Sequence, residues 1–308
     1  MKTRKKKIIL SLVLSLPLAL IIGLSVIPFV VMNPMLNQHC NFTQAWNADE
    51  YDLISNNFFV QSEDGLYLYV YEVAVENPKA AIICLSGIHN PSVTAYFGHA
   101  RMFADQGYAT FMLDLRAHGE SDGDRICVGY KEYLDVKAVL QHIKLNPLYQ
   151  NVPVVVMGVS MGGATAINAV GELPQLNGLI SLSAYSSWEE VFYENMAKAA
   201  PKLFAWVEKP FISLASMIKF GGRSCWVKPI KEIKKLGGRP AILMHTLDDS
   251  QVPYANFERL WKKAPASVET FVREGDRHFV ADHFTHPEED QEYAEALMGF
   301  LNKYFDRE

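Results

Sequence analysis

The chain has 308 residues, of which 49% are hydrophobic and 12% aromatic, so it can bury a large core and lacks the composition of a disordered protein. Its formal charge is −5, although five basic residues lie within the first seven positions: Lys2, Arg4, Lys5, Lys6 and Lys7. Without them, 24 basic residues face 34 acidic ones. A body with that excess of negative charge repels phosphate backbones, which argues against nucleic acid as a partner.

An uncharged stretch follows the basic segment 1–7. Residues 8–32 comprise 25 positions, about 37 Å as a helix, which exceeds the roughly 30 Å core of a bilayer. The sequence therefore predicts a single transmembrane anchor, with residues 1–7 in the cytoplasm and the remaining chain outside. The alternative is a signal peptide cleaved near Gly23-Leu24-Ser25, which would yield a secreted protein. Because the apolar stretch continues to Met32, we favour the anchor.

Residues 33–57 are polar and rich in asparagine, and they predict an irregular stalk. The folded body is expected over residues 58–305. It opens with two strand-like segments, 58–62 and 66–73, around the turn Glu63-Asp64-Gly65. Six further strand-like runs follow, at 80–86, 108–114, 152–158, 178–184, 240–246 and 267–273. Several of them are continuously apolar, as in a parallel sheet that is covered on both faces.

Helix-like segments alternate with these strands, at 94–106, 130–145, 161–172, 254–263 and 288–305. In the last segment, one face carries apolar residues at helical spacing: Ala294, Leu297, Leu301 and Phe305. The pattern predicts an α/β fold, with a mostly parallel eight-stranded sheet, helices on both of its faces and an antiparallel hairpin at its start.

One connection is longer than a crossover requires. More than fifty residues separate the sixth and seventh strand-like runs, whereas a crossover needs about a dozen. The inserted segment, at about 186–238, is rich in aromatic and aliphatic side chains. We expect a helical cap over a pocket at the carboxyl ends of the strands, where ligands bind in open α/β sheets. The alternative is an enlarged crossover that packs on the sheet.

A serine between glycines stands at the end of the fifth strand-like run. The sequence "VVVMGVSMGGA", residues 154–164, places Ser160 two residues after Gly158 and two before Gly162. Glycines at those positions allow a strand to enter a helix through a turn so tight that one side chain rises above the sheet, the nucleophile elbow. A strand precedes this serine and a helix-like segment follows it. Ser160 is therefore the predicted nucleophile.

A serine hydroxyl needs a base to take its proton, and an imidazole base needs a carboxylate to orient it. In this architecture the acid and then the histidine follow the serine along the chain, each on a loop after a strand. The sequence "HTLDDSQVP" offers Asp248 and Asp249 after one late strand, and "REGDRHF" offers His278 after the last.

These motifs resemble those of the α/β-hydrolase superfamily, and within it the serine aminopeptidase S33 and monoacylglycerol-lipase-like branch. The resemblance covers about residues 58–305 and includes "LDLRAHGESDG" at 113–123 and "EYLDVKAVLQHI" at 132–143. It implies the α/β-hydrolase fold, with the helical cap inserted after the sixth strand. In the family the acid precedes the pattern x-x-V-P, which implies Asp249, with Asp248 as the fallback.

An oxyanion hole is expected from two backbone N–H groups, those of Met161 after the nucleophile and Ile88 after the third strand. The second loop usually begins with histidine and glycine in this family, whereas here it reads "LSGIHN", with Ser86 in the place of the histidine. Gly87 still allows the backbone to turn, and His89 could shift the register by one.

Other chemically capable residues are assigned structural or surface roles. His118 and His245 are expected to be structural, His283 and His286 to lie on the surface, and Asp114 and Arg116 to organise a loop. No zinc-site spacing and no phosphate loop is present in the sequence, so neither a metal nor another cofactor is expected. The cysteines, which lack metal-ligand spacing, are expected to be buried thiols, with a Cys127–Cys225 bridge as the alternative: Cys40, Cys84, Cys127 and Cys225.

The sequence thus predicts a membrane-anchored serine hydrolase that cleaves carboxylic esters, small or lipid-derived, through an acyl-enzyme. The second hypothesis is a peptidase with the same catalytic residues, as the resemblance implies for one branch. It would need an acidic pocket for a substrate ammonium, for which the cap offers four residues: Glu189, Glu190, Glu194 and Glu208. The third hypothesis is a tethered binding domain without activity. The oligomeric state is not predicted.

Overall fold

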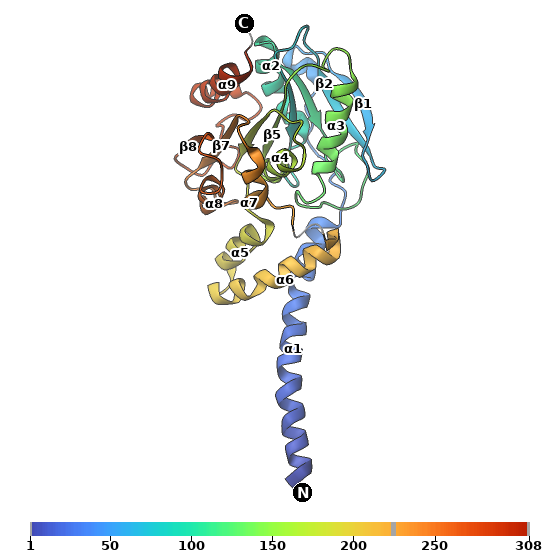
Figure 1. Cartoon of the computed structure of the whole chain (residues 1–308), viewed down its shortest axis with the longest axis vertical. Helices are drawn as coiled ribbons and strands as arrows, with labels where there is room; N and C mark the ends of the chain where they lie inside the picture. Colours follow the sequence, from blue (N-terminus) through green and yellow to red (C-terminus); the bar gives the residue numbers. More distant parts are fainter. Residues whose placement is uncertain (1, 223–225, 307–308) are drawn as a thin grey trace.

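A long N-terminal helix projects from a rounded body that contains all the strands (Figure 1). The computed structural model describes residues 2–222 and 226–306. The helix, α1 (Lys2–Leu36), meets the body beside the helices α5 and α6, whereas the described C-terminus lies at the opposite end (Figure 1).

Eight strands form one sheet in the order β1-β2-β4-β3-β5-β6-β7-β8. The pairs β1–β2 and β2–β4 are antiparallel, and the other five pairs are parallel. The strands are β1 (Asn56–Gln61), β2 (Tyr67–Val73), β3 (Ala81–Leu85), β4 (Ala109–Leu113), β5 (Val154–Val159), β6 (Gly178–Leu182), β7 (Ala241–Thr246) and β8 (Glu269–Arg273). The predicted mostly parallel sheet, opened by an antiparallel hairpin, is confirmed.

The central strands are apolar throughout because both faces of the sheet are covered. Every residue of β3 to β7 is buried, whereas the edge strands are more open: β1 has one buried residue, and β8 has only half-buried and exposed residues. One core lies under α3 (Tyr133–Leu145), α4 (Met161–Glu172) and α8 (Ala255–Trp261). The other core lies under α2 (Phe97–Asp105) and α9 (Gln291–Phe305). Short 3-10 helices precede α2 and α9, at Val93–Tyr96 and Pro287–Glu289.

The long insertion between β6 and β7 is helical. It contains α5 (Trp188–Ala199), α6 (Lys202–Phe220), α7 (Pro229–Glu232) and a 3-10 turn (Ile233–Leu236). Helices α5 and α6 pack against each other and stand away from the sheet, as Figure 1 shows. We call residues 186–238 the cap. On α6, one face is buried at helical spacing and includes Ala205, Ile212 and Ala215, while Leu203, Trp206 and Ile218 are exposed.

The N-terminal segment differs from the expected anchor at 8–32 and stalk at 33–57. Helix α1 continues to Leu36, and both Met32 and Leu36 are fully buried against the body. Beyond it, the Cys40 N–H donates to the Ala117 carbonyl at 2.8 Å, and Tyr51 is buried at the end of a 3-10 helix (Ala48–Tyr51). The difference arises because a few apolar residues among the polar ones dock this segment onto the body.

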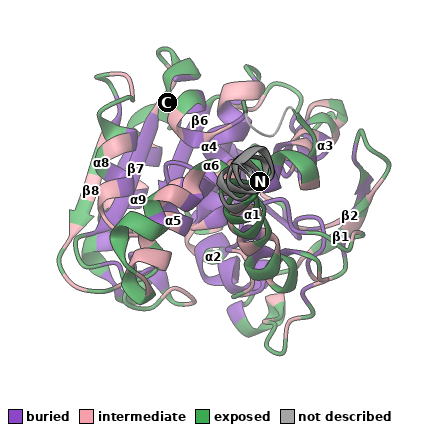
Figure 2. Cartoon of the chain, turned by 90° about the horizontal axis from the view of Figure 1, so that it is seen from below, coloured by how far each residue is buried: buried purple, intermediate pink, exposed green. Residues whose placement is uncertain are grey.

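Helix α1 is nevertheless long and apolar enough to cross a membrane, by length and composition. Its candidate span is Pro17–Leu36, 20 residues with a mean hydropathy of 2.1. Figure 2, which views the chain from the N-terminal end, shows exposed residues on the part of α1 nearer the body and buried residues gathered in the sheet and its helices.

Three cysteines are buried free thiols: Cys40, Cys84 and Cys127. Cys225, and with it the alternative bridge to Cys127, lies outside the described residues.

Candidate active site

Ser160 occupies the sharp turn between β5 and α4. Its backbone has φ +58° and ψ −118°, a conformation in which a Cβ atom is strained. The turn can close because two neighbours lack side chains. A Cβ on Gly158 would lie 2.3 Å from the Gly162 carbonyl, and one on Gly162 would lie 2.3 Å from the Leu85 carbonyl oxygen. The sequence pattern around Ser160 therefore corresponds to an elbow geometry.

Asp249 and His278 form a buried pair on the loops that follow β7 and β8. The distance from His278 Nδ1 to Asp249 Oδ2 is 2.9 Å. Asp249 Oδ1 also accepts hydrogen bonds at 2.8 Å from the backbone N–H groups of Gln251 and Val252. Burial alone would raise the pKa of Asp249, but the hydrogen bond from His278, its charge and the two N–H groups hold that pKa below its usual range. Asp249 therefore stays ionised and can orient the imidazole.

Asp248, the alternative candidate for the catalytic acid, makes no hydrogen bond with His278 in the described part of the chain. Asp248 is exposed, and its Oδ2 accepts a hydrogen bond from the Gly275 N–H at 3.2 Å. Of the two adjacent carboxylates, the structure thus brings Asp249 and not Asp248 to His278.

Ser160 and His278 both follow the carboxyl ends of their strands. Because β5 and β8 run parallel, with their carboxyl ends toward the cap, the two residues lie on the same side of the sheet's end. Among the hydrogen bonds of the described residues, none joins Ser160 Oγ to the His278 ring. The two sites adjoin through Gln251, which lines both the pocket that contains Ser160 and the cleft that contains His278.

The loop after β3 lies directly against Ser160. A Cβ on Gly87 would be 3.7 Å from the Ser160 Cβ. The Ile88 carbonyl points away to the His118 Nε2 atom at 2.7 Å, and the Ile88 N–H donates to none of the described residues. Met161, the second expected donor, is the first residue of α4, where helix N–H groups are unpaired. The loop geometry is thus compatible with the expected pair of donors.

His89 does not face this site. Its Nε2 atom lies 2.9 Å from the Met35 carbonyl oxygen of α1. The side chain therefore links the loop after β3 to the N-terminal helix.

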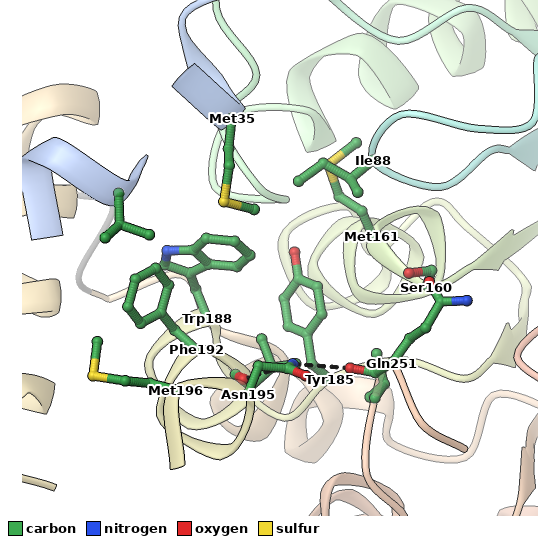
Figure 3. Close-up of a pocket in the computed structure, with 13 residues that line it drawn as sticks. Met35, Ile88, Ser160, Met161, Tyr185, Trp188, Phe192, Asn195, Met196 and Gln251 are labelled. Carbon is green, nitrogen blue, oxygen red and sulfur yellow. Dashed lines mark hydrogen bonds between the residues drawn. The ribbon is translucent and has the colours of Figure 1, made fainter. Parts of the chain in front are cut away.

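Ser160, Met161 and Ile88 line a pocket of about 410 Å³ together with side chains from α1, α5 and the loop after Asp249 (Figure 3). In Figure 3, Ser160 lies on one side, and Tyr185 stands between it and a cluster formed by Met35, Trp188 and Phe192. No acidic or basic side chain of the described residues lines this pocket, and its walls are mainly apolar: Val31, Met35, Ile88, Met161, Tyr185, Trp188, Val191, Phe192, Met196 and Val252, with the polar Ser160, Asn195 and Gln251.

The four acidic residues of the cap lie elsewhere. Three form ion pairs with basic side chains: Glu189 with Lys228 at 2.5 Å, Glu190 with Lys209 at 2.8 Å, and Glu194 with Arg259 at 2.5 Å. The fourth, Glu208, is fully buried on α6, and burial raises its pKa. None of the four lines the Ser160 pocket.

The residues assigned to structural roles hold the loops around the site. Arg116 donates to Asp135 Oδ1 at 2.6 Å and to Asp64 Oδ2 at 2.7 Å, which fastens the loop after β4 to α3 and to the first hairpin. His245 is buried behind Asp249, 2.9 Å from the Val252 carbonyl oxygen, and burial lowers its pKa. His39, which the sequence did not single out, contacts the carbonyl oxygens of Gly119 and Gly123 at 2.8 and 2.9 Å.

Two lining residues also escaped prediction, Val31 and Met35 of α1. Their positions fell in the expected anchor and stalk, and nothing in the local pattern indicates that this segment reaches the pocket. His283 and His286 are exposed as expected. Among the described residues, no group of three or more His, Cys, Asp or Glu side chains could hold a metal ion.

Comparisons with known proteins agree on one class. The family model described as serine aminopeptidase, S33 matches residues 76–224. The chain is 25% identical to the Bacillus subtilis protein YqkD over 227 residues, 73% of each chain. It is 35% identical to the monoglyceride lipase of Homo sapiens over 123 residues, which span 39% of this chain and only 40% of that lipase.

Among solved structures, an esterase of Pyrococcus furiosus superposes with a TM-score of 0.68 at 20% identity, over 87% of this chain and 98% of the esterase. The sheet, the cap and the similarity to this esterase show that the chain has the α/β-hydrolase fold. The family match and the relatives support an esterase- and lipase-like hydrolase, which resembles the serine aminopeptidase S33 family over residues 76–224.

Proposed function

We propose that this chain is a serine hydrolase that cleaves carboxylic esters through an acyl-enzyme on Ser160, with His278 as the general base and acid and Asp249 as its orienting carboxylate. The observation that carries the proposal is the pairing of Asp249 with His278 on loops at the same sheet edge as the strained turn of Ser160. A nucleophile, a base and an orienting anion are the three parts that acyl transfer requires.

The reaction proceeds in two halves. His278 takes the proton of Ser160 Oγ as that oxygen attacks the ester carbonyl carbon, and the N–H groups of Ile88 and Met161 stabilise the oxyanion. Collapse of the tetrahedral intermediate breaks the bond to the alcohol oxygen, which receives the proton from His278. Water then attacks the acyl-enzyme with His278 again as base, and the carboxylic acid leaves as Ser160 recovers its proton.

The walls of the pocket favour an apolar acyl group. The side chains beyond Ser160, among them Trp188 and Phe192, offer aliphatic and aromatic surface without a charged partner among the described lining residues. Each methylene that moves from water into such a pocket contributes about 0.8 kcal/mol, roughly fourfold in affinity. Similarity to a monoglyceride lipase also supports lipid-derived esters as substrates.

A membrane anchor is part of the proposal. Helix α1 is a candidate span, and the basic segment 1–7 before it favours a cytoplasmic N-terminus and a catalytic domain outside. The alternative is cleavage near residues 23–25, which would produce a secreted enzyme.

A peptidase with the same triad is the second candidate, supported by the family match to serine aminopeptidases. An aminopeptidase needs an anion to bind the substrate ammonium. The cap acids are a poor source, because Glu189, Glu190 and Glu194 already pair with basic side chains and do not line the pocket.

The test is a series of p-nitrophenyl esters, from acetate to dodecanoate, together with aminoacyl p-nitroanilides, on the detergent-solubilised full chain. We expect ester hydrolysis that rises with acyl length, and its loss in Ser160→Ala. Hydrolysis of the anilides without the esters would favour the peptidase. A well-folded protein that hydrolyses neither class would contradict the proposal.

A further inference from the structure

The C-terminal end of the candidate membrane helix reaches the pocket that contains Ser160. Val31 and Met35 of α1 are among the residues that line it. Figure 3 shows Met35 extending from α1 toward the ring of Trp188, on the far side of the pocket from Ser160. Positions 31 and 35 are one helical turn apart and therefore share one face of α1. A helix expected only to anchor the chain thus contributes two apolar side chains to the substrate pocket.

This end of α1 is fixed to the body on several sides. Met32 and Leu36, interleaved with the two lining residues, are fully buried in the core. The Leu36 carbonyl accepts a hydrogen bond at 2.8 Å from the N–H of Ile126. Lys219, in the last turn of α6, donates to the Asn37 side chain at 3.1 Å. Because these contacts hold the helix, Val31 and Met35 present a defined surface to a ligand.

The same end of α1 is coupled to the loop that carries an expected oxyanion donor. The Met35 carbonyl oxygen lies 2.9 Å from the ring of His89, the residue directly after Ile88. A shift of α1 would therefore move both the distal wall of the pocket at Met35 and the loop that carries Ile88 beside Ser160.

We propose that the last two turns of α1 form the distal wall of the acyl pocket and that Val31 and Met35 set the acyl length the enzyme accepts. This inference rests on the proposed ester hydrolysis at Ser160. The ligand is an apolar acyl chain, because the distal cluster of Met35, Trp188 and Phe192 is apolar.

The inference does not depend on whether α1 remains in a membrane. Val31 and Met35 lie after Gly23-Leu24-Ser25, so cleavage there would leave the wall in the mature chain. It does imply that a fragment starting near residue 35 lacks part of its substrate site.

The test replaces the wall and measures acyl-length selectivity in the full chain. In Val31→Trp, the added ring would occupy the distal space and exclude two or more methylenes. Since each buried methylene is worth roughly fourfold, we expect the ratio of kcat/KM for p-nitrophenyl dodecanoate to that for the acetate to fall by about tenfold or more. Met35→Ala enlarges the same region, so the longest esters should gain relative to shorter ones.

Val30→Trp is the matched control. Val30 is 65% exposed, does not line the pocket and points about 100° away around the helix. The same ring on the neighbouring residue should leave the dodecanoate-to-acetate ratio within about twofold of the wild type.

The outcomes separate the two proposals. An active wild type whose ratio is unchanged in both Val31→Trp and Met35→Ala would overturn the role of α1 and leave ester hydrolysis standing. A folded wild type that cleaves no ester would overturn the function itself. Should Val31→Trp fail to fold, Met35→Ala decides: a higher ratio for the longest esters supports the wall, and an unchanged ratio overturns it.

Discussion

From the backbone conformation of Ser160, we predict that any residue with a Cβ atom at this position lowers the stability of the fold. At φ +58° and ψ −118°, a residue with a Cβ atom is strained, whereas glycine is not. Ser160→Gly and Ser160→Ala both remove the hydroxyl, so both should be inactive. They differ only in the Cβ atom, which alanine keeps in the strained turn. Comparing the two variants therefore isolates the strain of the elbow from the loss of the hydroxyl.

The expected size follows from two opposing terms. A non-glycine residue in such a region costs about 1–3 kcal/mol in the native state. Glycine costs roughly 0.5–1 kcal/mol more than alanine in conformational entropy. Ser160→Gly should thus be more stable than Ser160→Ala by about 1–2 kcal/mol. For a body of this size, each kcal/mol corresponds to about 2–4 °C in Tm, so a difference of roughly 2–8 °C is expected.

The assay is thermal unfolding of the detergent-solubilised full-length variants, with the same pair of substitutions at Ser181 as the control. Ser181 is a buried residue of β6, and its φ is not positive. There the order should reverse, with glycine less stable than alanine by about 0.5–1 kcal/mol. If Ser160→Ala were as stable as Ser160→Gly, or more stable, the strained-elbow argument would be refuted.

Three further changes test the site and its support. Asp249→Asn should lower kcat for esters by about four orders of magnitude because it favours the wrong imidazole tautomer, whereas Asp248→Asn should stay within about twofold; equal losses in the two would contradict the assignment. Arg116→Lys cannot keep the buried forked contact with Asp135. The free energy of unfolding in urea should therefore fall by about 3 kcal/mol. An unchanged urea midpoint would contradict the structural role of Arg116. Burial raises the pKa of Asp114 to about 7 in the folded protein. Between about pH 4 and 7 the unfolded chain therefore releases this proton before the folded protein does, and the free energy of unfolding falls as the pH rises. Asp114→Asn should therefore gain stability over the wild type across that range, and a difference in unfolding free energy that is constant with pH would rule this out.

Much of the fold follows from local pattern. The continuous apolar runs locate the central strands to within two residues, because a strand covered on both faces must be apolar at every position. The glycines at 158 and 162 predict the tight turn, since any side chain there would collide with the backbone. The choice between Asp248 and Asp249 came from the family pattern, and the contact with His278 agrees with it.

The end of α1 could not be predicted in this way. Met32 and Leu36 are buried at the end of α1, a helix that packs against α6, whose residues follow more than 160 positions later. Periodicity within one segment carries no information about such a distant partner, and the polar composition of residues 33–57 conceals the few apolar residues that dock it. The contribution of Val31 and Met35 to the pocket appears only once the cap is in place.

The most direct test of the central claim is to map the site of covalent labelling by a fluorophosphonate on the full chain, using the mass of the modified peptide. We expect one phosphonate adduct on Ser160, loss of the adduct in Ser160→Ala, and slow labelling in His278→Ala. An adduct on a different residue, or ester hydrolysis that survives Ser160→Ala, would contradict this claim.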